Sequence, residues 1–472
     1  MKKFVPLIFS LMLFSNTSFA APIPLRGIVE GFYGTPWTNE QRIDLMYFCR
    51  NYNLNAYIYA PKDDPYHRDK WRTPYPTEKV EELEKLVAAA KQNGVRFIFA
   101  ISPGLDLNYT GAKGDEDLKF LLRKIDSMYN IGVRNFAIFF DDLKDDKGKH
   151  HEDGKRHAEF LNNLQDKLSK YYGDIEPLIT VPTEYYRFDM INGRGKVNDY
   201  TEDFAENLNK KIIVLYTGNG VVCDGISDKD FQATCKIFRR DLGIWWNYPV
   251  NDYSLTPNGN RNAKLALGAI DNLPTKNVQA ILFNPMSQYN LSKIALATGA
   301  DYANAPQIYD AETSWDNNIN WQYGRVAEAM KIFAIHSRHM ENDWANCGAE
   351  DAPEFETAAS LVISSARSGR SLLSTDELSV QIDNMERAAD ILLENLSPEY
   401  LEECKPQLEQ FKRIAQADRL ALKSLQDKKL DPQLKILREE ISKNEPNAIL
   451  SEKVALKFID DTINLLDVKK KR

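Results

Sequence analysis

The chain has few cysteines and few histidines for its length. Its 472 residues include five cysteines and six histidines, with no Cys-x-x-Cys pair. The histidines lack the spacing of metal ligands. We therefore expect no metal site, no cofactor and no disulfide-rich scaffold. Cys223 and Cys235 are the closest pair in sequence, but their spacing alone does not establish a disulfide.

Long apolar runs are absent after the N-terminus. Within residues 1–20, Lys2 and Lys3 precede the apolar residues 4–14, and Ser18-Phe19-Ala20 forms a small-x-small cleavage pattern. This arrangement predicts a secretory signal peptide, because a membrane span requires about 20 apolar residues. We expect a mature protein without a membrane span, exported to the periplasm or secreted.

The chain also lacks an excess of positive charge. Its formal net charge is −8, and removal of residues 1–20 would leave 58 basic and 68 acidic residues, a net charge of −10. An acidic protein is a poor candidate for binding nucleic acid or anionic membranes. The basic residues 469–472 are interpreted as a solvated tail.

Strand-like and helical patterns alternate eight times between residues 25 and 303. The predicted strands are 26–30, 56–60, 96–102, 136–140, 178–182, 212–217, 244–246 and 278–283. The predicted helices are 38–51, 77–93, 115–130, 153–171, 202–208, 228–240, 261–270 and 291–303. Eight such units predict a (β/α)8 TIM barrel over residues 21–315. The alternative, an open doubly wound sheet, would need a glycine-rich phosphate loop, and Gly218-Asn219-Gly220 lacks the rest of that motif.

Residues 316–472 have a different pattern. Long amphipathic helical segments are predicted at 321–341, 354–368, 375–395, 399–428, 434–443 and 453–468, with few β-branched runs between them. This pattern predicts an all-α helical bundle domain. It contains no catalytic constellation that we can recognise. We consider two roles for this helical domain: it supports the barrel, or it forms a homodimer contact.

The strand predicted at residues 136–140 ends in two adjacent carboxylates, Asp141 and Asp142. Two carboxylates this close do not both ionise easily, so one is expected to keep its proton near neutrality. An acid beside a base suits glycosidic bond cleavage. Two other interpretations are a solvated turn or helix cap and, over residues 141–145, the Asp-Asp-x-x-Asp pattern of Mg²⁺-diphosphate enzymes. The preceding strand argues against the latter, because that pattern normally lies on a helix.

Other predicted strands also end in polar or aromatic residues. Because active sites of this fold lie at the carboxyl ends of the strands, these side chains are expected to surround one cavity. Amides, carboxylates, an ammonium group and aromatic rings are suited to binding sugar hydroxyls and an apolar sugar face. The residues concerned include Gly31, Tyr33, Lys62, Tyr185, Trp245, Asn247, Asp252 and Asn284.

Several motifs in order resemble those of glycoside hydrolase family 84, the O-GlcNAcase type of β-N-acetylglucosaminidase. They are residues 26–37 (RGIVEGFYGTPW), 59–68 (YAPKDDPYHR), 139–142 (FFDD), 182–185 (PTEY), 245–252 (WWNYPVND) and 284–286 (NPM). The resemblance covers about residues 25–303, and the family also has a helical domain after its barrel.

The resemblance implies a retaining, substrate-assisted mechanism, in which the substrate's 2-acetamido oxygen attacks the anomeric carbon and forms an oxazoline. Asp141 would orient the acetamido N–H, and Asp142 would act as the acid and then the base. Tyr185 would help to place the acetamido group, and the Trp245 ring would pack against its methyl group. Sugar hydroxyls would be bound by Gly31, Lys62, Asn247, Asp252 and Asn284.

The resemblance thus predicts an exo-acting β-N-acetylglucosaminidase whose substrate is a GlcNAc-bearing glycan or glycoprotein. An endo-acting hyaluronidase is a second possibility, and a catalytically silent GlcNAc-binding protein is a third, of a different class. For Lys62, a purely neutralising role beside Asp63 or Asp64 stays open, and Tyr33 would otherwise be an ordinary core residue.

Overall fold

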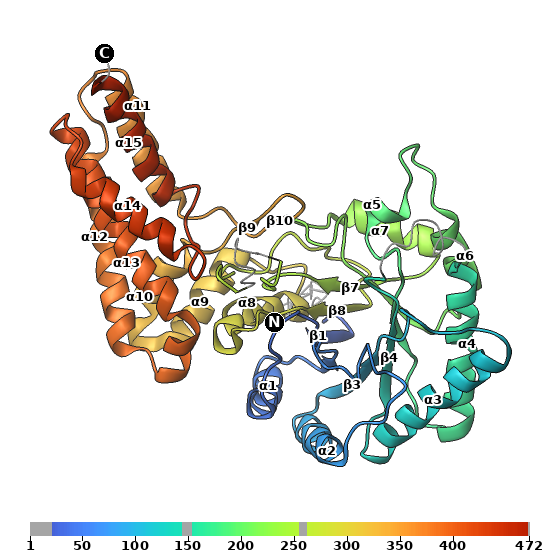
Figure 1. Cartoon of the computed structure of the whole chain (residues 1–472). Coiled ribbons are helices and arrows are strands. Elements are labelled where there is room, and N and C mark those ends of the chain that lie inside the picture. The colour runs from blue at the N-terminus through green and yellow to red at the C-terminus, as the bar shows by residue number, and fades with distance from the viewer. Residues whose placement is uncertain (1–20, 144–152, 254–261, 471–472) are drawn as a thin grey trace, which may run out of the picture.

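Eight parallel strands close into a barrel in the order β1-β2-β3-β4-β5-β6-β7-β8 (Figure 1). The computed structural model describes residues 21–143, 153–253 and 262–470, so the predicted signal peptide lies outside the described residues. The strands are β1 (Leu25–Glu30), β2 (Ala56–Tyr59), β3 (Arg96–Ile101), β4 (Asn135–Phe139), β5 (Ile179–Val181), β6 (Ile213–Tyr216), β7 (Gly243–Trp246) and β8 (Ala280–Phe283). All eight predicted strands are present, and the predicted TIM barrel is confirmed.

Both faces of the strands are buried, which explains why they appear in the sequence as continuous apolar runs. Neighbouring side chains on a strand point to opposite faces. Val29 belongs to the cluster that fills the barrel interior, whereas Ile28 packs in the larger core outside it. The interior packing ends at the carboxyl edge of the strands, where polar residues follow.

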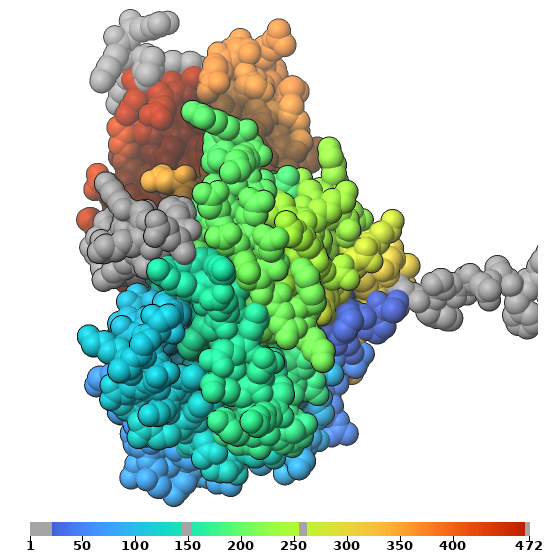
Figure 2. All heavy atoms as spheres, turned by 90° about the vertical axis from the view of Figure 1, so that its right-hand side faces the viewer, coloured from blue at the N-terminus to red at the C-terminus, as the bar shows by residue number. Residues whose placement is uncertain are grey.

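Helices on the outside of the barrel follow its strands in the chain, except between β7 and β8, where the described residues form none. They are α1 (Asn39–Asn51), α2 (Thr77–Gln92), α3 (Gly111–Asn130), α4 (Gly154–Tyr172), α5 (Arg187–Met190), α6 (Asp199–Asn207), α7 (Asp228–Phe238) and α8 (Tyr289–Asn304). Helix α1 begins with a capping box between Thr38 and Gln41. Figure 2 views the barrel from one side, where segments coloured cyan to green form the surface.

The helix predicted at residues 261–270 is wrong. Residues 262–270 form no helix, because their backbone groups bond elsewhere. The Leu267 N–H donates to the Ser337 carbonyl at 2.8 Å and the Gly268 N–H donates to the Tyr248 hydroxyl at 2.7 Å. The apolar spacing that suggested a helix reflects burial: Leu265, Leu267 and Ile270 have no exposed surface.

The region after the barrel is helical and extends to one side of it (Figure 1). It contains α9 (Ala311–Tyr323), η1 (Gly324–Val326), α10 (Ala327–Ala334), α11 (Pro353–Arg367), α12 (Thr375–Asn395), α13 (Pro398–Gln426), α14 (Pro432–Asn444) and α15 (Ala455–Lys470). The boundary predicted between residues 315 and 316 falls within α9, so a single helix crosses it.

The single helix predicted at residues 321–341 is also wrong. Gly324 takes a positive φ of 50°, which interrupts the helical pattern between α9 and η1. Helix α10 then ends at Ala334, and the chain forms a small antiparallel hairpin from β9 (Met340–Glu341) and β10 (Asn346–Cys347).

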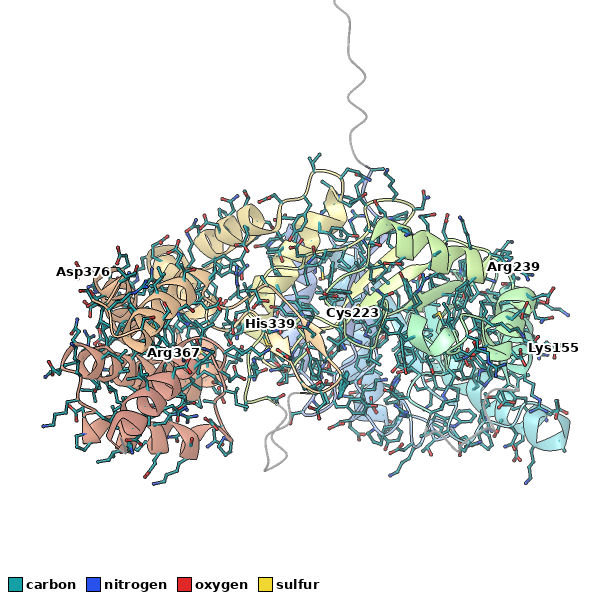
Figure 3. All side chains as sticks on the ribbon, turned by 90° about the horizontal axis from the view of Figure 1, so that it is seen from above. Lys155, Cys223, Arg239, His339, Arg367 and Asp376 are labelled. Atoms are coloured by element: carbon teal, nitrogen blue, oxygen red, sulfur yellow. The ribbon has the colours of Figure 1, made fainter. Side chains whose placement is uncertain are left out.

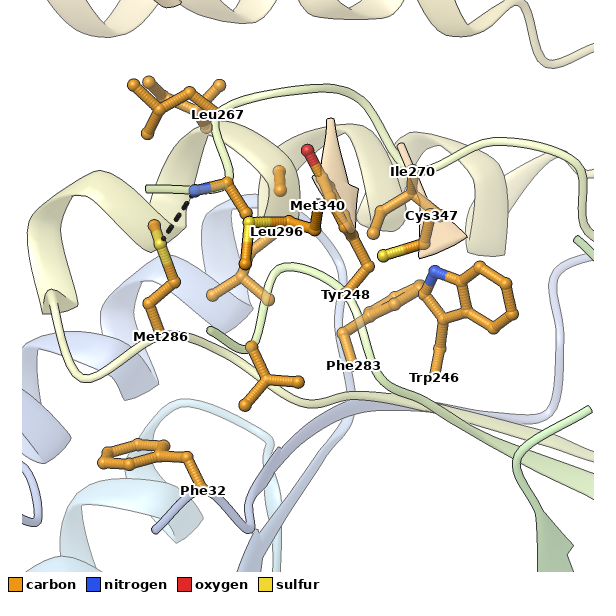
Figure 4. Packing of buried hydrophobic residues seen from close by; sticks show 14 of the residues in the cluster. Phe32, Trp246, Tyr248, Leu267, Ile270, Phe283, Met286, Leu296, Met340 and Cys347 are labelled. Carbon is orange, nitrogen blue, oxygen red and sulfur yellow. Dashed lines mark hydrogen bonds between the residues drawn. The ribbon is translucent and has the colours of Figure 1, made fainter. Parts of the chain in front are cut away.

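The β9–β10 hairpin packs directly on the barrel. The Tyr248 hydroxyl donates to the Arg338 carbonyl at 2.8 Å. Met340 and Cys347 are buried, and Figure 4 shows them packed near Tyr248 and Trp246, the latter at the end of β7. In Figure 3, His339 lies near the middle of the molecule, whereas Arg367 and Asp376 lie out in the helical region.

All five cysteines are free thiols, so Cys223 and Cys235 are not bonded to each other. Cys223 instead lies with its sulfur 3.7 Å from the Thr217 carbonyl oxygen. Within residues 21–143, 153–253 and 262–470, no helix has both the length and the apolar content needed to cross a membrane.

Candidate active site

A cavity of about 280 Å³ opens at the carboxyl ends of the barrel strands. All ten residues predicted from the sequence line it: Gly31, Tyr33, Lys62, Asp141, Asp142, Tyr185, Trp245, Asn247, Asp252 and Asn284. Trp245 lies in β7, and the other nine residues follow β1, β2, β4, β5, β7 and β8. The parallel barrel thus brings together residues that are separated by more than 250 positions in the sequence, as this fold generally does. Their roles in binding and catalysis stay predictions.

Asp141 lies at the bottom of the cavity, two residues after the end of β4. Its side chain is 9% exposed and forms an ion pair with Lys62, whose side chain is 3% exposed. Burial alone would lower the pKa of Lys62, but the charges of Asp141 and Asp142 outweigh it and hold the pKa above its ordinary value. The Asp141 Oδ1 atom is buried and has no hydrogen-bond partner among the residues that the structure describes. A carboxylate oxygen in this position is prepared to accept a donor from a ligand.

Asp142 takes a left-handed backbone conformation, with φ at 51°, one that aspartate tolerates better than most residues. This turn directs its carboxylate to two hydroxyl groups. Tyr33 donates to Asp142 Oδ2 at 2.8 Å, and Tyr185 donates to Asp142 Oδ1 at 2.9 Å. Backbone strain of this kind is common at functional sites.

The protonation predicted for the acidic pair differs from what the geometry favours for Asp142. Burial alone would raise the pKa of Asp142, but the Lys62 charge, the hydroxyls of Tyr33 and Tyr185 and the charge of Arg68 together hold it below its ordinary value. These contacts therefore favour the ionised form of Asp142 in the ligand-free protein. The sequence argument considered repulsion between adjacent carboxylates, but it did not include the ammonium group beside both of them.

Tyr33 links the acidic pair to the opposite side of the cavity. Its backbone N–H donates to Asp252 Oδ2 at 2.7 Å, while its hydroxyl bonds Asp142. Burial raises the pKa of Tyr33 to about 12, so the hydroxyl stays a donor at physiological pH.

The Trp245 indole forms one wall of the cavity, and amide groups fix its position. Its Nε1–H donates to Asn247 Oδ1 at 2.8 Å. The Asn284 amide donates to the same oxygen at 2.9 Å, and the Gly31 N–H donates to Asn284 Oδ1 at 3.2 Å. Gly31 has no side chain to obstruct the indole: a Cβ there would lie 2.3 Å from Trp245 Cζ2.

Seven cavity residues were not predicted from the sequence: Val181, Thr217, Val221, Val222, Val250, Tyr253 and Trp344. Most follow predicted strands, and their position at the strand ends was the available signal. Trp344 is different, because it comes from the β9–β10 hairpin within the region predicted to be only a helical bundle. Its side chain is 57% exposed and contacts the Tyr253 ring at 5.3 Å between centroids.

Arg68 was quoted within a motif but was not predicted as a site residue. Its Nη2 donates to the Asp142 carbonyl oxygen at 2.7 Å, and its Nη1 donates to the Tyr33 hydroxyl at 3.3 Å. Arg68 therefore supports both the backbone and the side-chain environment of Asp142.

Among the described residues, no three His, Cys, Asp or Glu side chains converge as metal ligands. Asp145, the last residue of the Asp-Asp-x-x-Asp pattern, lies outside the described residues. The polar groups of the cavity are carboxylates, amides, hydroxyls and one ammonium group, arranged beside an indole.

Adjacent carboxylates at the end of a barrel strand, with an aromatic wall and converging amides, are typical of glycoside hydrolases. The model of the β-N-acetylglucosaminidase family matches residues 26–335. The chain belongs to this family, glycoside hydrolase family 84, and is a glycoside hydrolase. A second model, described as hyaluronidase post-catalytic domain-like, matches residues 357–459.

Curated relatives include the protein O-GlcNAcases of Rattus norvegicus and Mus musculus. Each is 34% identical over 284 residues, a match that covers 59% of this chain and 30% of the relative. The chain thus matches less than a third of the length of these relatives.

Two solved structures are similar over nearly the whole chain. CpGH84B has a TM-score of 0.84 at 36% identity, covering 94% of this chain and 77% of that one. A mutant of the Thermobaculum terrenum O-GlcNAc hydrolase has a TM-score of 0.80 at 27% identity, covering 95% and 96%.

Proposed function

We propose that the protein is a retaining, exo-acting β-N-acetylglucosaminidase that removes terminal β-linked GlcNAc through an oxazoline intermediate. The observation that carries this proposal is Asp141, which lines the cavity together with Trp245 and Tyr185. Its Oδ1 atom is buried and has no hydrogen-bond partner among the described residues. The N–H of a 2-acetamido group is a donor suited to this oxygen.

In the first step, the acetamido carbonyl oxygen attacks the anomeric carbon, and the bond to the leaving oxygen breaks. Asp141 accepts the hydrogen bond of the amide N–H and stabilises the positive charge that develops there. Asp142 donates its proton to the leaving oxygen. In the second step, a water molecule attacks the anomeric carbon, gives a proton to Asp142 and opens the oxazoline, with overall retention of configuration.

Asp142 must gain a proton before it acts as an acid. In the ligand-free protein, its pKa is held below the ordinary value, chiefly by Lys62 once the opposing effect of burial is counted. A bound sugar excludes water from the open side of this carboxylate, and desolvation favours the neutral form. Substrate binding and protonation of Asp142 are thus coupled in this proposal.

Exo action is supported by the position of Asp252 and Asn284 across the cavity from the acidic pair. Asp252 accepts the Tyr33 N–H, and Asn284 accepts the Gly31 N–H, so the two side chains are held in place at the wall. A sugar seated against Asp141 would place its outer hydroxyls against these groups. This arrangement favours the end of a chain over an internal sugar.

The natural substrate is proposed to be a GlcNAc-bearing glycoprotein or glycan, as the names of the curated relatives suggest. Export through residues 1–20 and dimerisation through the helical region stay predictions.

The experiment compares wild type with Asp141→Asn and Asp142→Asn on an aryl β-N-acetylglucosaminide. General acid–base groups contribute roughly 10²–10⁴-fold to rate, so Asp142→Asn should lose activity in that range on a substrate whose leaving group needs protonation. Asp141→Asn should also lose activity, because the developing positive charge is no longer stabilised. Asp126→Asn is the matched control, since Asp126 lies on α3 and accepts from Tyr172, and it should retain full activity. An inert wild type that still binds GlcNAc would support the binding protein instead.

Two further measurements test the mechanism and the exo action. A thiazoline analogue of the oxazoline should inhibit far more strongly than GlcNAc, and equal or weaker inhibition would contradict the neighbouring-group mechanism. Release of internal fragments from hyaluronan would contradict exo action and favour the hyaluronidase alternative.

A further inference from the structure

A buried histidine stacks on the residue that precedes the acidic pair, and the proposed mechanism does not use it. His157, in the first turn of α4, is 1% exposed. Its imidazole stacks on the Phe140 ring at 4.1 Å between centroids, with 10° between the planes. Phe140 immediately precedes Asp141 and Asp142, so the imidazole supports the last residue before the carboxylates.

Both imidazole nitrogens contact tyrosine hydroxyls. Nε2 lies 2.8 Å from the Tyr109 hydroxyl, and Nδ1 lies 2.9 Å from the Tyr200 hydroxyl. Tyr109 lies in the segment between β3 and α3, and Tyr200 lies in the first turn of α6. His157 therefore connects three separate segments below the cavity, and a neutral imidazole can satisfy both contacts with one donor and one acceptor.

The network continues from Tyr200 to the end of β5. The Tyr200 hydroxyl accepts the Thr183 backbone N–H at 3.0 Å. The next residue of α6, Thr201, donates to Glu184, which also accepts from Asn198 at 3.2 Å. Residues 183 and 184 are thus held by α6 immediately before Tyr185, whose hydroxyl bonds Asp142.

Close packing keeps α4 against α6. A Cβ on Gly154 would lie 2.1 Å from the Tyr200 carbonyl oxygen, so only glycine permits the first turn of α4 to approach this closely. Figure 1 shows α4 and α6 as neighbours on the outside of the barrel. This contact sets the distance over which His157 reaches both Phe140 and Tyr200.

We propose that His157 is a positioning residue for the proposed acid: by stacking on Phe140 and bonding Tyr200, it fixes the ends of β4 and β5 so that Asp142 meets Tyr185. The inference rests on the proposed function, because it assigns the acid role to Asp142. It predicts that loss of the network impairs proton delivery to the leaving oxygen more than substrate binding.

The test uses aryl β-N-acetylglucosaminides that differ only in the pKa of the phenol released. Leaving groups such as 2,4-dinitrophenol need little protonation, whereas methylphenols depend on the acid. His157→Phe keeps a flat ring against Phe140 but removes both hydrogen bonds. It should lower kcat/KM less than about three-fold for the dinitrophenyl substrate and about ten-fold or more for the methylphenyl substrate, since positioning errors of an acid reach this size.

Tyr200→Phe is the second variant, because it deletes a single hydroxyl and disturbs the fold less. It should reproduce the effect of His157→Phe, and the double variant should be no worse than either alone, as expected for residues acting through one network. If both single variants match wild type across the whole series, or if their losses simply multiply, the inference is wrong.

Gln165→Leu is the matched control. Gln165 is buried in the same helix and accepts the Leu178 N–H at 2.7 Å, so it holds the opposite end of β5. This variant should lower the melting temperature without changing the leaving-group dependence. If Gln165→Leu changes the leaving-group dependence of kcat/KM as much as His157→Phe does, the effect of His157 is structural and the proposed positioning role is wrong.

Asp142→Asn separates failure of this inference from failure of the proposed function. If Asp142 is the acid, this variant retains most of its kcat/KM on the dinitrophenyl substrate and little on the methylphenyl substrate, because kcat/KM reports the step in which the phenol leaves. A kcat/KM of Asp142→Asn that is equally impaired on both substrates, or an inert wild type, would reject the proposed function. A normal Asp142→Asn result with an unchanged His157→Phe series would reject the inference alone.

Discussion

Lys62 Nζ lies 3.6 Å from Asp142 Oδ2 while it pairs with Asp141. One buried ammonium group thus lies within ion-pair distance of both members of the acidic pair. Coulombic attraction at this distance in a buried site is strong, and it favours the ionised form of the carboxylate. The position of Lys62 therefore affects the pH range over which Asp142 carries its proton.

Lys62→Met should move the alkaline limb of the pH profile of kcat/KM to higher pH. Removal of the positive charge raises the pKa of Asp142, so the carboxyl keeps its proton, and hence its acid function, to higher pH. Overall activity should also fall, because Lys62 lines the cavity. Lys264→Met is the control, since Lys264 is also buried but pairs with Glu452. An alkaline limb that stays in place would contradict the assignment.

Arg68→Met should lower kcat about ten-fold or more, with a smaller change in KM. Its guanidinium holds the Asp142 carbonyl oxygen at 2.7 Å, and a small displacement of a catalytic group is costly. The neighbouring Arg72 bonds Asp106 and Asp117 instead, so Arg72→Met should affect stability and leave kcat unchanged. Equal kcat values for the two variants would show that Arg68 has no special role.

Gly31→Ala should weaken binding of the thiazoline inhibitor and raise KM. The new Cβ would lie 2.3 Å from Trp245 Cζ2, so the indole must turn and lose its 2.8 Å bond to Asn247. Gly193→Ala is the control, because a Cβ at Gly193 meets no atom within 4 Å. Isothermal titration calorimetry would measure both variants. Unchanged inhibitor affinity in Gly31→Ala would show that the indole wall tolerates displacement.

Asp418→Leu should stabilise the helical region at neutral pH. Asp418 lies in α13 and is fully buried, and within the described part of the chain neither of its carboxyl oxygens has a hydrogen-bond partner. Burial raises the pKa of Asp418 well above its ordinary value. Burial of an unpaired polar group costs roughly 1–3 kcal/mol, so the melting temperature of the variant should exceed that of wild type.

The pH dependence of this effect has a definite sign. A carboxyl with a raised pKa in the folded state binds its proton more tightly when folded, so wild-type stability falls as pH rises above the unfolded value of about 3.9. The advantage of Asp418→Leu should therefore grow between pH 4 and pH 8. Asp427→Leu, at an exposed position of the same region, should show no such growth. A constant difference across pH would contradict a neutral, buried Asp418.

The barrel and the cavity residues were largely predictable from the sequence for a physical reason. Parallel strands buried on both faces appear as apolar runs, and the residue after each run necessarily lies at the carboxyl edge. Asp141, Tyr185 and Asn284 could be placed together on this basis alone. The helix predicted at residues 261–270 failed because its apolar spacing was correct but its backbone N–H groups bond Ser337, Tyr248 and Thr298.

Other features depend on contacts that no sequence pattern encodes. Arg68 donates to the backbone carbonyl of Asp142. Because every residue has such a carbonyl, this contact leaves no signal in the type of residue that accepts it. The ionised state of Asp142 depends on a cation contributed by another strand end. Trp344 lies between strands of two residues each, which are too short to have a periodicity.

The β9–β10 hairpin has a consequence for how this enzyme can be divided and recombined. The family match over residues 26–335 ends before Trp344, yet Trp344 lines the cavity. A barrel excised at that limit would lack Trp344 at its cavity and would leave Tyr248 without its carbonyl partner at Arg338. Chimeras that exchange helical regions between relatives should therefore cross over within α11 or later, so that barrel and hairpin are inherited as one unit.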